Sequence, residues 1–228
     1  MTSTTEASLS NQPTRRRRHT VWIPAALIVL VVIPALGGVA RLVELAGGQT
    51  NLPPKPAVTA APLPLILHIV TGIAYAVLGA FQFVPALTRR RRIWHRIDGR
   101  IVVVLGLVVA FTALWMNQIT PRDSGAAVLL YVFRLVAGSG MATAAVLGVT
   151  SIRRGDVRAH RAWMTRSYAL AFGAATQVFT IGIGQAVVGK TELMNALMNG
   201  TAWILNLAIA EHAIRLDSRE RSQRRLSA

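Results

Sequence analysis

The residues best suited to chemistry gather in one stretch of the chain, HRAWMTRSY at positions 160–168. This stretch sets a histidine and two arginines at the beginning of an otherwise apolar run. Neutral imidazole is the commonest protein ligand of metal ions and also binds haem iron, whereas guanidinium groups hold propionates or phosphates. The residue types are therefore those of a site for a metal ion, a haem or a phosphate group.

Two further stretches carry the same residue types to what we expect to be the same face of the protein. They are RRRRIWHRIDGR at positions 89–100 and NLAIAEH at positions 206–212, and each borders an apolar run. We predict that the three stretches form one site for b-type haem or a divalent metal ion. The predicted ligands are His95, His160, Glu211 and His212, with supporting roles for Arg96, Arg100, Arg161, Arg166, Gln82 and Asn206.

A simpler interpretation of these stretches stays open. No two of the three histidines stand three or four positions apart on one helix, so the local zinc-binding pattern is absent. Histidine–arginine pairs at helix starts also bind lipid phosphate, with Trp163 and Tyr168 as anchors at the membrane surface. Glu211 favours a binding site over lipid anchoring, because a carboxylate four residues from the end of an apolar span needs a histidine or arginine partner.

A second group of polar residues lies deeper in the apolar runs. A helix rises about 1.5 Å per residue, which places His68 roughly 20 to 30 Å from the arginine-rich stretches. Arg134 and Gln177 lie at comparable depth on other runs. Because such side chains are costly against lipid, we expect His68 and Arg134 to face the bundle interior. Two interpretations stay open. In one, His68 is hydrogen-bonded between helices and the side chain of Arg134 extends to the outer membrane surface; in the other, they form a site for a quinone head group, an anion or a haem.

A membrane bundle must position all of these residues. The chain is 53% hydrophobic and 15% charged, with a mean hydropathy of +0.46. Several apolar runs reach about 20 residues, the length of a membrane span. We predict an all-α integral membrane bundle of six transmembrane helices, at residues 21–45, 65–87, 100–119, 126–152, 162–188 and 193–214. Residues 1–20 are expected to form a disordered tail, residues 21–214 the transmembrane domain and residues 215–228 a basic tail.

The basic residues orient this bundle. Twenty of them border the predicted spans on one side and only Lys55, Arg122 and Lys190 lie on the other. Because Lys-rich and Arg-rich loops stay in the cytoplasm, both termini are predicted to be cytoplasmic and the protein to reside in the inner membrane. The charge of +16 then reflects orientation and contact with anionic phospholipid. No groove-reading or stacking motif for nucleic acid accompanies it, and the absence of cysteine excludes disulfides and iron–sulfur clusters.

Four motifs, taken in order, resemble the bacterial membrane proteins of domain-of-unknown-function family 2306. They are GAFQF at 79–83, HRIDGR at 95–100, HRAWMTRSYAL at 160–170 and the segment 206–211, and the resemblance covers roughly residues 60–215. It implies a multi-helix inner-membrane protein without an assigned activity. It nominates His68, Gln82, His95, Arg100, His160, Arg166 and Glu211 as functional, whereas Arg134 belongs to none of the motifs.

Two hypotheses of different classes therefore remain. The first is a redox or metal-dependent membrane protein that holds b-haem or a divalent ion and exchanges electrons with quinone. The second is a non-enzymatic membrane module that binds lipid, a small solute or a partner subunit.

Overall fold

The computed structural model describes residues 15–52, 60–82 and 92–226, and within these ranges the chain forms seven helices and no strand. They are α1 (Arg15–Leu45), α3 (Pro62–Gln82), α5 (Arg92–Ile119), α6 (Gly125–Arg153), α7 (Val157–Ala171), α8 (Gly173–Val188) and α9 (Glu192–Leu226). Five spans are long and apolar enough to cross a membrane, and the bent pair α7–α8 makes a sixth if counted as one. The predicted all-α membrane bundle is confirmed. Of the disordered tail predicted at residues 1–20, residues 1–14 lie outside the described residues and residues 15–20 belong to α1.

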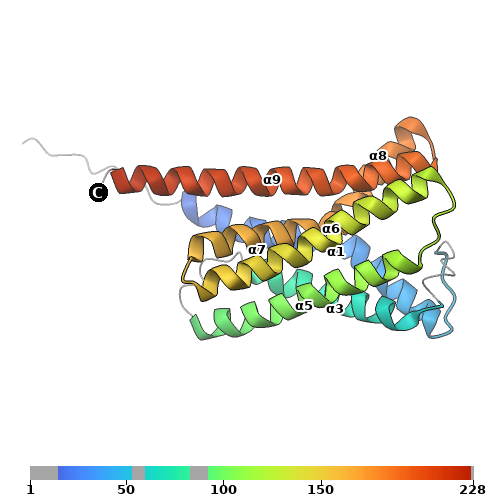
Figure 1. Cartoon of the computed structure of the whole chain (residues 1–228), viewed down its shortest axis with the longest axis horizontal. Coiled ribbons are helices and arrows are strands. Elements are labelled where there is room, and N and C mark those ends of the chain that lie inside the picture. Colours follow the sequence, from blue (N-terminus) through green and yellow to red (C-terminus); the bar gives the residue numbers. More distant parts are fainter. Residues whose placement is uncertain (1–14, 53–59, 83–91, 227–228) are drawn as a thin grey trace, which may run out of the picture.

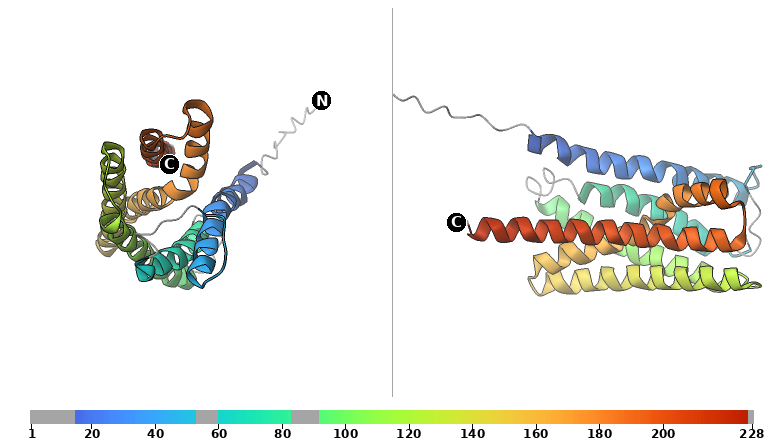
Figure 2. Two further views of the ribbon diagram at one scale, coloured as in Figure 1. Left: turned by 90° about the vertical axis from the view of Figure 1, so that its right-hand side faces the viewer. Right: turned by 90° about the horizontal axis from the view of Figure 1, so that it is seen from above.

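The spans run side by side in alternating directions along one long axis (Figure 1). At one end, here called the arginine-rich end, α5 and α7 begin and α6 ends. At the opposite end, α3 and α9 begin and α5 ends. Seen end-on, the helices follow one another around the bundle, from α1 through α3, α5 and α6 to α9 and α8 (Figure 2). Contact between α8 and α1 completes the circuit, so the helices enclose a common interior.

Several helix boundaries differ from the sequence-based prediction, and α1 begins at Arg15 rather than at residue 21. Helix α3 begins at Pro62 rather than at residue 65, because prolines fit the first turn, where no backbone donor is needed. Helix α5 begins at Arg92 rather than at residue 100, so Arg96 and Arg100 lie on its first turns. Helix α9 continues through the predicted tail to Leu226. At 1.5 Å per residue its length of about 52 Å exceeds a hydrocarbon core of about 30 Å, so its last turns project beyond the membrane.

The span predicted at residues 162–188 is not one helix. It consists of α7 and α8, which meet at Phe172 with a bend of 44°. Helix α7 packs between α6 and α9, whereas the main neighbours of α8 are α9 and α1. Trp203 of α9 lies against Gly173, where an added Cβ would stand 2.0 Å from its indole Nε1. The bend turns α8 away from α6 and leaves space between the spans.

Asn206 of α9 holds both sides of this bend. Its side-chain oxygen accepts a hydrogen bond from Thr176 of α8 at 2.9 Å, and its amide donates to the carbonyl of Ala169 in α7 at 3.2 Å. An aromatic cluster closes the interior beside it: the ring centroids of Tyr75 and Tyr168 are 5.5 Å apart, and those of Tyr168 and Phe172 are 4.6 Å apart. Tyr75, Tyr168 and Phe172 are buried, so the cluster is part of the bundle core at this level.

Candidate functional site

A cavity of about 640 Å³ occupies the space beside the bend. Its walls come from all seven helices, α7 contributing only its end at Leu170 and Ala171, and they are mostly apolar. Along α5 it reaches from Thr120 at the opposite end to Val109, a depth of roughly 16 Å at 1.5 Å per residue. The polar and aromatic residues of its lining include Arg41, His68, Tyr75, Asn117, Thr120, Arg134, Gln177, Asn199 and Trp203.

Arg134 is a cation of this cavity that has no partner among the described residues. Its side chain is half-buried in the wall formed by α6, and in the described part of the chain no group accepts a hydrogen bond from its guanidinium. Arg41, on α1, differs because its guanidinium pairs with Glu44 at 2.6 Å. A guanidinium offers five N–H donors, so Arg134 presents unused donors to the cavity.

His68 is held in one orientation by α5. Its Nδ1 lies 3.2 Å from the carbonyl of Val109 and 3.1 Å from the hydroxyl oxygen of Thr112. The Thr112 hydroxyl donates its own hydrogen to the carbonyl of Val108 at 2.7 Å, so both neighbours of Nδ1 act as acceptors. Nδ1 must therefore carry the hydrogen, and in the neutral ring Nε2 keeps a free lone pair.

The side-chain amide of Asn117 adds a further hydrogen-bond acceptor to the cavity wall. The side-chain nitrogen of Asn117 donates to the carbonyl of Tyr131 at 3.0 Å, whereas its oxygen is buried and has no donor among the described residues. Among the described residues, the side chain of Gln177 makes a single long hydrogen bond, 3.5 Å, from its nitrogen to the carbonyl of Asn199. The cavity thus combines one unpaired cationic donor with acceptor atoms on other walls, and apolar surface fills the space between them.

The residues predicted to lie deep in the spans line this one cavity. His68, Arg134 and Gln177 all contribute to its wall, and the expectation that His68 and Arg134 face the bundle interior agrees with this placement. The sequence-based prediction missed Arg41, Asn117, Asn199 and Trp203. A signal for them was present, because each lies within an apolar span at a depth that can be counted from the opposite end as it was for His68.

At the arginine-rich end, Glu211 has the partner that its place in an apolar span requires. Arg166 of α7 donates two hydrogen bonds to its carboxylate, from Nε at 2.5 Å and from Nη2 at 3.1 Å. The same guanidinium lies over the ring of Trp163, 4.6 Å from its centroid. This pair joins α7 to α9, and it engages both carboxylate oxygens of Glu211.

His160 points to a different neighbour. Its Nδ1 lies 2.8 Å from the carbonyl of Gly148 in α6, so it faces α6. Six residues later on the same helix, a rotation of about 240°, Arg166 faces α9. His212 is exposed. The structure therefore does not bring His160 together with Glu211.

The predicted metal or haem ligand set finds no support at this end. Within the described residues, no three His, Asp or Glu side chains stand close enough to hold a metal ion. The side chain of His95 lies outside the described residues, so its part in such a site stays a prediction.

Some of the predicted supporting residues make hydrogen bonds between helices, and others are exposed arginines. Gln82, at the end of α3, donates a hydrogen bond to Asp98 near the start of α5. Asn206 holds the α7–α8 bend, as described above. Arg96, Arg100 and Arg161 are exposed. Several residues of the sequence motifs therefore join helices rather than line one site.

Comparison with known proteins agrees with this architecture. The family model described as "Predicted membrane protein (DUF2306)" matches residues 65–214, which is more than half of the chain. The match begins after α1 and covers every helix from α3 to most of α9. No curated protein and no solved structure matches the chain.

Proposed function

The chain belongs to the DUF2306 family of predicted membrane proteins, and we propose that it binds a small amphipathic molecule in the cavity beside the α7–α8 bend. The ligand has an oxygen-bearing head group and an apolar body, and a quinone head group is the specific candidate. The volume of about 640 Å³ lies in the range of small-molecule sites, about 300 to 1,000 Å³. With the arginine-rich loops in the cytoplasm, the cavity lies in the outer half of the membrane.

The unpaired guanidinium of Arg134 is the observation that carries the proposal. A charged side chain near the middle of a membrane span costs about 2.5 to 3.5 kcal/mol, and Arg134 has no partner among the described residues to offset this cost. A ligand oxygen provides that partner. A carbonyl oxygen or an anionic oxygen accepts from the guanidinium, and the apolar walls contact the rest of the ligand.

His68 and Asn117 supply the complementary groups. The lone pair on His68 Nε2 and the buried oxygen of Asn117 accept hydrogen bonds, so they suit a hydroxyl group. The reduced, hydroxyl-bearing form of a quinone donates to these acceptors, and the oxidised form accepts from Arg134. The cavity therefore offers partners to both forms, and binding needs no electron transfer within this chain.

Trp203 gives a direct binding assay, because it lines the cavity and quinones quench indole fluorescence on contact. In a variant with the other four tryptophans changed to phenylalanine, a short-chain quinone titrated into nanodiscs quenches Trp203. A hydrogen bond to a charged group contributes about 1.5 to 3 kcal/mol, so Arg134→Gln weakens binding about 10-fold to 100-fold.

Arg122→Gln is the matched control. Arg122 is an exposed arginine near the same end of the bundle, and its guanidinium lies over the ring of Tyr131, 4.3 Å from the centroid, outside the cavity lining. Its substitution leaves the affinity unchanged. Equal affinities for Arg134→Gln and the parent protein contradict the proposal, as does quenching that never saturates.

The orientation of His68 favours b-type haem as the second candidate. A histidine that ligates a metal through Nε2 commonly donates its other nitrogen to a carbonyl, which is the arrangement found here with Val109. Met116 and Met141 line the same cavity and carry thioethers, which serve as haem ligands in some proteins. A visible absorption spectrum of the purified protein decides: a haem band that His68→Ala removes selects this candidate, and a blank spectrum leaves the quinone proposal.

A further inference from the structure

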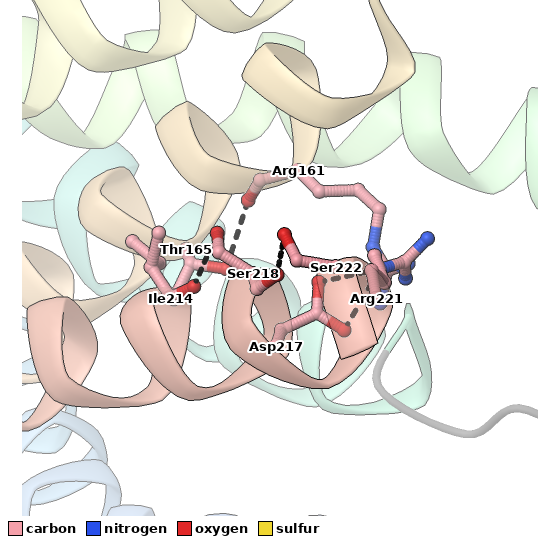
Figure 3. Close-up of polar contacts among 7 residues, drawn as sticks. All are labelled: Arg161, Thr165, Ile214, Asp217, Ser218, Arg221 and Ser222. Atoms are coloured by element: carbon pink, nitrogen blue, oxygen red, sulfur yellow. Dashed lines mark hydrogen bonds and ion pairs between the residues drawn. The ribbon is translucent and has the colours of Figure 1, made fainter. Parts of the chain in front are cut away.

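A second hollow lies at the arginine-rich end, far from the cavity described above. It is a groove of about 230 Å³ between the first turns of α7 and the part of α9 that projects beyond the predicted span. Its lining consists of Val157, Arg158, Arg161, Asp217, Arg221 and Ser222. Figure 3 shows the side chain of Arg161 reaching from α7 towards Arg221 of α9.

Positive charge exceeds negative charge in this groove. Three arginines face one carboxylate, Asp217, and that carboxylate is already engaged. Arg221 donates from Nε to both oxygens of Asp217, at 3.1 and 3.0 Å, so its two terminal nitrogens remain available. Arg158 and Arg161 have no ion-pair partner in the part of the chain that the structure describes. Guanidinium groups that share a small groove repel one another unless an anion lies between them.

We propose that this groove binds the phosphate group of an anionic phospholipid. Phosphate accepts paired hydrogen bonds from guanidinium groups, and the terminal nitrogens of Arg158, Arg161 and Arg221 are the donors. The groove lies where α7 and α9 leave the membrane, at the level of lipid head groups. Val157, in the groove, is 55% exposed, and Leu216, beside it on α9, is 44% exposed. Because α9 runs outward at this end, Leu216 stands nearer the membrane than Asp217 and Arg221, and it contacts the lipid chains, which free phosphate lacks. Val157 begins α7 and lies on the outer side of the groove.

Binding of this lipid also accounts for the length of α9. The helix continues well beyond a membrane span, and its last turns carry Asp217, Arg221 and Ser222 to the groove. A bound phosphate joins these turns to the start of α7. This proposal does not depend on the cavity near the opposite end, so either can fail while the other stands.

Native mass spectrometry of the detergent-purified full chain tests the proposal. Phosphatidylglycerol binds at one tight site that phosphatidylcholine does not fill. The double variant Arg158→Gln/Arg161→Gln weakens that site about 30-fold, from about 1 kcal/mol for each arginine at a membrane surface. Arg153→Gln/Arg154→Gln removes the same charge from exposed positions near the end of α6, outside the groove, and leaves the tight site intact.

Two results overturn the proposal. Equal weakening by both double variants indicates general attraction between basic residues and lipid, without a defined site. Displacement of phosphatidylglycerol by soluble glycerol phosphate at the same concentration indicates a site for free phosphate, without a role for lipid. Ser222→Asp is the second variant: it adds a carboxylate to the groove while every arginine stays, and it lowers the affinity as strongly as the double variant.

Discussion

Gly173→Ala tests the packing that produces the α7–α8 bend. A Cβ at this position would lie 2.0 Å from Nε1 and 2.3 Å from Cδ1 of the Trp203 indole, whereas ordinary contacts begin near 3.4 Å. The indole or the α8 backbone must move, and such overpacking costs about 1 to 3 kcal/mol. Alanine recovers at most about 1 kcal/mol of helix propensity, and less at the first residue of a helix. We therefore expect net destabilisation.

Gly182→Ala is the control in the same helix. An added Cβ at Gly182 meets nothing within 4 Å, and the residue is exposed in the middle of α8. Thermal unfolding in detergent, followed by circular dichroism, compares the two variants. At roughly 2 to 4 °C for each kcal/mol in a chain of this size, a net cost of about 1 to 2 kcal/mol for Gly173→Ala lowers Tm by about 2 to 8 °C. Gly182→Ala leaves Tm unchanged or raises it.

A third variant tests whether the Trp203 indole causes the destabilisation by Gly173→Ala. In a Trp203→Phe background the smaller ring leaves room for the new methyl group, so Gly173→Ala should cost less there than in the parent protein. Non-additivity of this kind is the mark of two residues in contact. If Gly173→Ala and Gly182→Ala shift Tm equally, or if the cost of Gly173→Ala is the same in both backgrounds, the packing explanation of the bend is wrong.

Two further predictions concern the arginine-rich end and the topology. Glu211→Gln breaks the bidentate pair with Arg166. A partly exposed pair of this kind contributes about 1 kcal/mol, so Tm falls by roughly 2 to 4 °C. Adding Arg166→Gln to this variant lowers Tm little further, and a double variant whose two effects add fully would contradict the pairing. Reporter fusions after residues 51, 92, 123, 156 and 191 are expected to alternate between the outside and the inside, and two adjacent fusions on one side would remove a span.

The apolar runs were sufficient to predict the membrane bundle, because a span of about 20 apolar residues has few alternatives to a helix in lipid. They also predicted that Glu211 needs a basic partner. The choice of Arg166 over His160 was not predictable from depth alone, since both lie near the same end. It depends on rotation about the α7 axis, and the side of α7 that meets α9 is set by tertiary packing.

The bend at Phe172 was missed for a related reason. No proline marks it, and a single glycine in an apolar helix is a weak signal. The cause lies elsewhere in the sequence, in Trp203 and Asn206 of α9, which contact the bend from a separate span. The cavity follows from the bend, so its existence could not be derived from one span at a time, although the depth of His68, Arg134 and Gln177 already indicated which residues would line it.

Photo-crosslinking locates the ligand most directly. A light-activated quinone analogue, irradiated with the purified protein in nanodiscs and mapped by peptide mass spectrometry, should label the cavity walls at residues 65–76, 109–120, 134–141 and 170–177. Excess unmodified quinone should suppress this labelling, and Arg134→Gln should reduce it. Labelling confined to lipid-facing positions such as Val29 and Leu36 of α1, or labelling that excess quinone does not suppress, would contradict a binding site in the cavity.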